Sequence, residues 1–284
     1  MDYDKFLAAI RWTRQEWEKR NPTPASGYQK HTCCSYPALR ERGDEYWLHL
    51  EKMNSVWLEE EIVDCFLNTS RWYCHLDPPH TLRRRSMVCN LKKAVDQLPE
   101  YYADLKGLRI EDFDTEGNVF LKGREKPVTF VIDSIYSIFR NVEFNFAKVA
   151  ASKLMHMALP DILMMWDNDI IDGYNVPRQN LVGFTKRVRS YTAFLILMQE
   201  NIRHIKETCP GGSHLTNHAF QRQINKGCGY EDLPITRLLD IANYAVAHPE
   251  KGAPPVKCDR CIQVTNSRLD KLAWSRQNRV GRFR

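Results

Sequence analysis

Apolar residues recur at the three- and four-residue spacing of an α-helix along most of this chain. Near the start, Phe6, Ile10 and Trp17 keep this spacing, and Pro22 ends the run because proline cannot continue a helix. The same spacing predicts further helices over residues 45–67, 83–95, 133–159, 183–206 and 234–247. Helices with apolar faces must bury them against one another, so we expect a mainly α-helical fold with one compact domain.

The pattern changes between residues 107 and 133. Two short β-prone runs, 118–122 and 128–132, are separated by Gly123 and preceded by Gly117. Glycine at such boundaries favours turns, so we expect a small β-hairpin inserted into the helical domain.

Positive charge is concentrated at the C-terminal end. The chain carries 41 Lys and Arg and 35 acidic residues. From Lys251 onward there are nine basic residues and only two acidic ones. Prolines between 249 and 255 mark a linker, which predicts a helical domain over 1–248 and a semi-independent basic tail over 249–284. Such a tail suits a polyanionic partner such as DNA, because binding releases counterions from the phosphates. The alternative is a solvated tail that keeps the protein in solution.

Apolar content and cysteine use indicate the compartment. Hydrophobic residues make up 43% of the chain, enough for a sizeable core, yet no apolar run is long enough to span a membrane. The first residues mix charges where a signal peptide needs an apolar stretch. We therefore expect a cytoplasmic protein without membrane association, whose nine cysteines are mostly reduced thiols.

One cysteine pair has the spacing of a metal ligand pair. Cys258 and Cys261 form a single C-x-x-C, which supplies half of a tetrahedral zinc site. Zinc is the one cofactor that the sequence suggests, and ordinary thiols are the alternative. A thioredoxin-like role has no βαβ context around the pair. The residues available as further ligands are Cys209, Cys228, His214, His218 and His248.

Chemically usable residues are densest between 148 and 170. On a helix, Lys153 and His156 share a face, whereas Lys148 lies five positions before Lys153 and points elsewhere. Pro160 ends this helix. Asp167 precedes another helical run, which makes its carboxylate a natural N-cap. His156 and the methionines around it are expected in the core.

A residue pattern in this region resembles known families. It reads small-Ser-Lys-x-x-His over 151–156, then x-Pro, then Trp-Asp-x-x-Ile over 166–170, and the runs 66–72 and 237–244 belong with it. The pattern is similar to uncharacterised helical bacterial and phage proteins. More distantly, a lysine-bearing helix, a proline turn and an Asp that caps the next helix resemble the core of helix-hairpin-helix DNA glycosylases.

The resemblance implies a base-excision site. In those glycosylases the Asp assists departure of the base, and in bifunctional members a lysine attacks the sugar carbon to form a Schiff base. Carried over, Asp167 is the catalytic carboxylate, and Lys153 or Lys148 is the nucleophile. A fixed carboxylate would stabilise the positive charge that develops on the sugar. The alternatives are that Asp167 only caps a helix and that Lys153 is a solvated side chain.

Basic residues outside this region are the expected nucleic-acid contacts, although such clusters are usually solvated helix faces. The rival interpretations are a nucleic-acid-binding protein without catalysis and a structural or interaction protein of a phage or defence system. The expected contacts are Arg83, Arg84, Arg85, Lys186, Arg187, Arg189, Arg276, Arg279 and Arg282.

Overall fold

The computed structural model describes the chain in several ranges. These are residues 1–20, 90, 93, 94, 97, 101, 105, 107–111, 117–121, 123–141, 151–153, 155, 156, 159–176, 178, 179, 188–255 and 257–280. The helix predicted over 45–67 lies outside them. Of the helix predicted over 83–95, only residues 90, 93 and 94 are described, and all three are helical.

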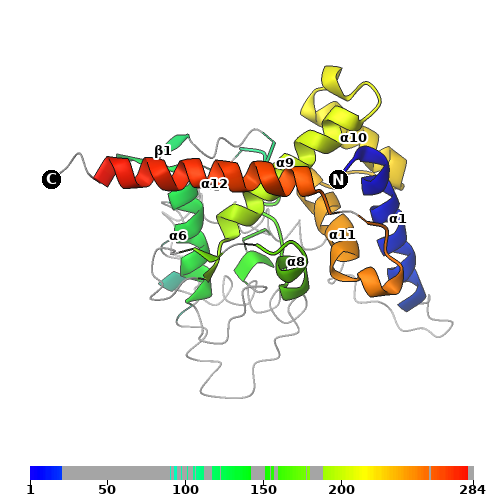
Figure 1. Ribbon diagram of the computed structural model, residues 1–284, viewed down its shortest axis with the longest axis horizontal. Coiled ribbons are helices and arrows are strands. Elements are labelled where there is room, and N and C mark those ends of the chain that lie inside the picture. The colour runs from blue at the N-terminus through cyan, green and yellow to red at the C-terminus, as the bar shows by residue number, and fades with distance from the viewer. Residues whose placement is uncertain are drawn as a thin grey trace, which may run out of the picture.

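The described chain is mainly helical with a small antiparallel hairpin, which confirms the predicted fold class (Figure 1). None of its helices is both long and apolar enough to cross a membrane. The α-helices are α1 (Tyr3–Arg20), α6 (Val128–Arg140), α8 (Asn168–Gly173), α9 (Tyr191–Thr208), α10 (Asn217–Cys228), α11 (Ile235–Ala247) and α12 (Asp259–Val280). Two 3₁₀ turns are η2 (Gly212–His214) and η3 (Pro249–Lys251), and the strands are β1 (Asn118–Leu121), β2 (Arg124–Pro127), β3 (Arg178–Gln179) and β4 (Val188–Arg189).

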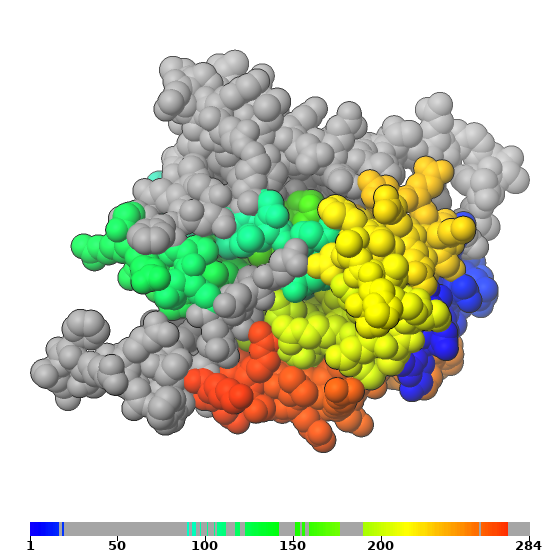
Figure 2. Space-filling view, turned by 90° about the horizontal axis from the view of Figure 1, so that it is seen from above, coloured from blue at the N-terminus to red at the C-terminus, as the bar shows by residue number. Residues whose placement is uncertain are grey.

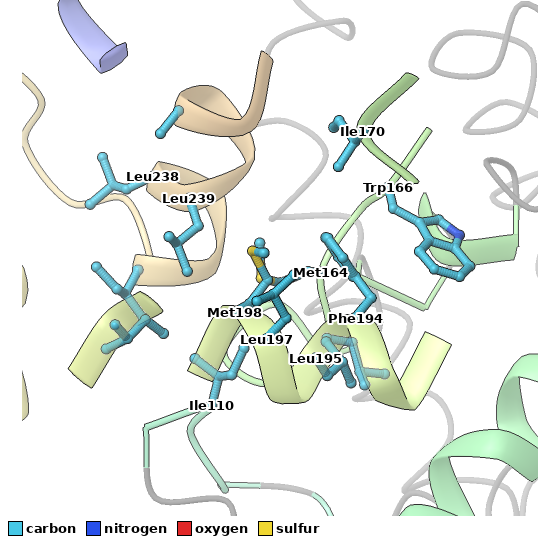
Figure 3. Close-up of a cluster of buried hydrophobic side chains, with 14 of the residues drawn as sticks. Ile110, Met164, Trp166, Ile170, Phe194, Leu195, Leu197, Met198, Leu238 and Leu239 are labelled. Carbon is cyan, nitrogen blue, oxygen red and sulfur yellow. The ribbon is translucent and has the colours of Figure 1, made fainter. Parts of the chain in front are cut away.

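Helix α9 is the centre of the core. Every residue from Tyr191 to Ile202 is buried, and α1, α6 and α12 all pack against this helix. Around its first turns, Phe194 and Met198 meet apolar side chains of the 162–170 segment and of α11 (Figure 3). An aromatic group closes this end of the core, with the Tyr136 and Tyr191 rings stacked at 5.2 Å and the Trp166 ring edge-on to both.

The hairpin forms where expected, but its second strand is displaced. Asn118 pairs with Pro127 and Leu121 with Arg124, and Gly123 occupies the turn at φ 69°, which favours glycine. The strand predicted over 128–132 is wrong, because Val128 starts α6. That segment is buried on nearly all sides as a helix, so its apolar and β-branched residues do not show the three- and four-residue spacing of a half-buried helix.

The helix predicted over 183–206 also begins later than expected. Val188–Arg189 is a short strand paired with Arg178–Gln179, and α9 starts at Tyr191. The Ser190 hydroxyl caps the helix by accepting a hydrogen bond from Ala193 N at 3.0 Å. Helices α10 and α12 are not predicted from the sequence, because their many polar residues leave no clear apolar spacing.

The first half of the basic tail is anchored to the domain. Helix α12 crosses α9 (Figure 1), and Cys261 and Thr265 are buried in the contact. The guanidinium of Arg268 forms an ion pair with Glu200 and donates a hydrogen bond to Gln199 Oε1 at 3.1 Å. The domain boundary at 249 stays a prediction, but these contacts attach the start of α12 to the core.

The position of α9 predicts a large cost for shortening its core side chains. Phe194 is fully buried, so Phe194→Ala should lower the free energy of unfolding by about 3–5 kcal/mol through lost burial and a residual cavity. Chemical denaturation measures this loss. Val264→Ala is the control, because Val264 is 38% exposed on α12 and its truncation should change stability by less than about 0.5 kcal/mol. Equal effects of both substitutions would contradict a core centred on α9.

Candidate functional site

A buried serine holds the two central residues of the motif next to each other in the fold. The Ser152 hydroxyl donates to the Trp166 carbonyl at 3.2 Å and accepts from Trp166 N at 3.1 Å. Lys153 follows the serine and Asp167 follows the tryptophan. This pair of hydrogen bonds therefore fixes the helix that carries Lys153 beside the strand-like segment that leads into Asp167.

His156 has a structural role, as expected from the sequence. It is buried, and its Nδ1 lies 2.6 Å from the Leu163 carbonyl, which can only accept, so Nδ1 carries the proton. Burial lowers the pKa of His156 to about 4, and the charge of Arg237 acts in the same direction. The ring is therefore neutral near pH 7. The prediction of a methionine-rich core is confirmed for the described members Met155, Met164 and Met165, whereas Met157 lies outside the described residues.

Asp167 caps α8, as predicted. Its Oδ1 accepts a hydrogen bond from Ile170 N at 2.8 Å. Within the described parts of the chain, Oδ2 makes no hydrogen bond, and the residue is only half-buried. The cap thus fixes the orientation of the carboxylate.

Asp240 of α11 is the residue that the sequence analysis did not single out. Its side chain is 4% exposed, and Oδ2 lies 3.4 Å from a guanidinium nitrogen of Arg237. Its Oδ1 has no hydrogen-bond partner in the part of the chain that the structure describes. Burial raises its pKa to about 8, and Arg237 opposes the rise. The charge of Asp167 raises this pKa further and that of Lys153 lowers it.

Three segments distant in sequence therefore converge on one acidic group. Lys153, Asp167 and the Arg237–Asp240 pair lie close enough for their charges to act on the Asp240 carboxyl. The run 237–244 belonged to the motif pattern, and an acid on the inner face of a helix was the signal that could have identified Asp240. A buried acid held neutral near pH 7 is typical of functional sites, although structural ion pairs also produce one.

Two backbone amides of the turn after the Lys153 helix donate hydrogen bonds inside the fold. The N–H groups of Ile162 and Leu163 both donate to the Leu159 carbonyl, at 3.2 and 2.8 Å. The Pro160 carbonyl accepts a hydrogen bond from the Thr236 hydroxyl of α11. This turn is thus tied to the core.

An open cavity of about 400 Å³ lies beside α6, lined by Phe130, Ser134, Asn141 and residues between 90 and 101. Neither Lys153 nor Asp167 lines it. The structure therefore places the charged residues of the motif together without placing them in this cavity.

Most of the residues expected to contact nucleic acid lie outside the described parts of the chain. Arg189 lies in β4, and Arg276 and Arg279 lie in the last turns of α12. The residues outside the described ranges are Lys148, Arg83, Arg84, Arg85, Lys186, Arg187 and Arg282.

The C-x-x-C pair is buried at the start of α12, and its two thiols differ electrostatically. Burial would raise the pKa of Cys258, but hydrogen bonds from the Cys261 thiol, from the Met1 ammonium and from Cys261 N lower it overall. Burial and the neighbouring Cys258 raise the pKa of Cys261 to about 12. Across the described residues, no three His, Cys, Asp or Glu side chains gather as a metal site. The zinc site stays a prediction.

The chain matches no protein-family model, no curated protein and no solved structure.

The raised pKa of Asp240 predicts a specific pH dependence of stability. Between pH 4 and 8 the folded protein keeps this proton and the unfolded chain loses it, so the carboxyl lowers stability as pH rises. Asp240→Asn cannot ionise. The free energy of unfolding of Asp240→Asn should therefore rise relative to that of wild type as pH increases from 4 to 8, by up to about 1 kcal/mol per pH unit.

Denaturation at pH 5, 6, 7 and 8 measures the difference, with Asp270→Asn on the exposed side of α12 as the control. A constant difference between wild type and Asp240→Asn across the series would show that Asp240 ionises normally.

Proposed function

We propose that this protein binds nucleic acid, with DNA as the expected partner, and that Lys153, Asp167 and Asp240 form a base-excision site. One observation carries the proposal, namely that the charges of Lys153 and Asp167 both act on the buried carboxyl of Asp240. Residues that the glycosylase resemblance assigns to catalysis thus lie around a protonated acid, an arrangement that a helix cap alone does not need.

Asp167 is the group that stabilises the developing sugar cation. Breaking the bond between base and sugar leaves positive charge on the sugar, and a carboxylate already fixed in place lowers the energy of that state. The hydrogen bond from Ile170 N orients Asp167, so its other oxygen can face the sugar without reorganisation.

Lys153 is the candidate nucleophile. Its ammonium group would first lose a proton to solvent. The neutral nitrogen would then bond to the sugar carbon while the base departs with the electrons of the broken bond. Loss of a second proton from nitrogen and opening of the sugar ring would turn this adduct into a Schiff base. Asp240 is a positioning residue in this scheme. While protonated, Asp240 adds no negative charge beside Asp167 and Lys153.

Binding without catalysis is the second candidate. The cap that Asp167 provides is a sufficient structural reason for an Asp at the start of α8. An interaction protein has less support, because Val264 is the one large apolar side chain that is exposed among the described residues. Figure 2 shows the first part of α12, in orange, along one edge of the molecule. Arg276 and Arg279 belong to the later part of this helix, and in this proposal they contact the polyanion.

Asp167→Asn separates catalyst from cap. Asparagine caps helices about as well as aspartate, so stability should change by less than about 0.5 kcal/mol, whereas base release should fall at least ~100-fold because the charge is lost. Asp167→Ala is the matched variant and should also lose about 1 kcal/mol of stability. The measurements are single-turnover base release from damaged and mismatched DNA and chemical denaturation.

Borohydride trapping tests the nucleophile. Reduction in the presence of abasic DNA should fix a covalent protein–DNA adduct, and Lys153→Ala should abolish it while Lys93→Ala should not. Absence of base release and of adduct for wild type, on single- and double-stranded substrates, would reject the enzyme and leave the binding protein.

The C-terminal arginines predict the salt dependence of binding. Replacing Arg276, Arg279 and Arg282 together by Gln should weaken DNA binding and flatten the slope of log K against log salt by up to about 3. These substitutions keep Cys261, Thr265 and Arg268, whose contacts attach α12 to the core, whereas deletion of the tail removes them. Fluorescence anisotropy between 50 and 300 mM salt measures the slope. An unchanged slope would show that the tail does not contact phosphates.

A further inference from the structure

The cysteine pair at the start of α12 is a reactive feature that base excision leaves unused. Cys258 is the N-cap residue, since its carbonyl accepts a hydrogen bond from Ile262 N at 3.1 Å. Its Sγ acts as the capping acceptor for Cys261 N at 3.3 Å. The Cys261 thiol donates to Cys258 Sγ over 2.6 Å. The two sulfurs are therefore already close to the separation of about 2.05 Å found in a disulfide.

The surroundings favour sulfur chemistry over metal binding. Two thiols are half of a zinc site, and no third ligand joins them among the described residues. Partial positive charge at a helix N-terminus stabilises a thiolate, and Cys258 Sγ occupies that position. Cys258 is 8% exposed and Cys261 3%, so a reagent reaches Cys258 first.

We propose that Cys258 and Cys261 are a redox-active dithiol that exchanges with small-molecule disulfides such as glutathione disulfide. The Cys258 thiolate attacks one sulfur of glutathione disulfide, whose S–S bond breaks and releases one glutathione thiolate. Cys261 then loses its proton to solvent, and its sulfur attacks Cys258 Sγ and displaces the second glutathione. Two protein thiols are oxidised to one disulfide, and one glutathione disulfide is reduced to two glutathione molecules.

Peptide mapping of the full chain tests this directly. After incubation with glutathione disulfide, acid quench and alkylation, trypsin cleaves after Lys257, Arg260 and Arg268, leaving the two cysteines on separate peptides, 258–260 and 261–268. We expect these peptides to be joined, and dithiothreitol to separate them. Cys209 and Cys228, which are buried on other elements, serve as internal controls and should be alkylated after unfolding.

Single substitutions assign the order of the steps. Cys261→Ser should stop at a glutathione adduct on Cys258, whereas Cys258→Ser should lose the adduct because Cys261 is less exposed. Circular dichroism checks that both variants fold, and the wild-type mapping stands without them. The proposal fails if the native pair stays alkylatable in excess glutathione disulfide while the guanidinium-unfolded chain forms the bond. Tightly bound zinc that blocks the exchange would also contradict it.

Discussion

The complete burial of α9 between Tyr191 and Ile202 is the constraint on which the rest of the structure depends. A helix without a solvent face must be surrounded, and α1, α6 and α12 supply that cover. The same helix contacts the motif region through Tyr191. Its hydroxyl accepts a hydrogen bond from Met164 N at 2.8 Å and donates one to the Met164 carbonyl at 2.5 Å. Packing around α9 thus holds the segment that ends in Asp167.

Polar groups placed inside this packing define the candidate site. The Ser152–Trp166 hydrogen bonds satisfy backbone groups that would be costly to bury unpaired, and they also set Lys153 near Asp167. Asp240 differs from Ser152, because its Oδ1 is buried with no hydrogen-bond partner among the described residues. Such a group destabilises the fold when ionised. Its presence beside Asp167 and Lys153 is the strongest physical reason to consider this region functional.

Periodicity alone predicts the helical class, α1, α11 and the Asp167 cap, because each depends on local spacing or on one capping residue. It wrongly predicts the second hairpin strand at 128–132. That segment is a helix buried on nearly all sides, so its sequence does not show the apolar spacing of a half-buried helix. Periodicity also misses α12, whose sparse apolar residues contact α9 across the fold. The role of Asp240 depends on Lys153 and Asp167, which are distant in sequence, and no local sequence pattern identifies them as its neighbours.

The central claim is that Lys153, Asp167 and Asp240 form one electrostatic unit. Carboxyl ¹³C NMR titration of Asp-labelled protein tests it most directly, by following Asp240 in wild type, Asp167→Asn and Lys153→Ala. The account predicts a wild-type pKa for Asp240 of about 8, a lower pKa when Asp167 loses its charge and a higher one when Lys153 is removed. An Asp240 pKa near its ordinary value, or one that neither substitution moves, would contradict the account.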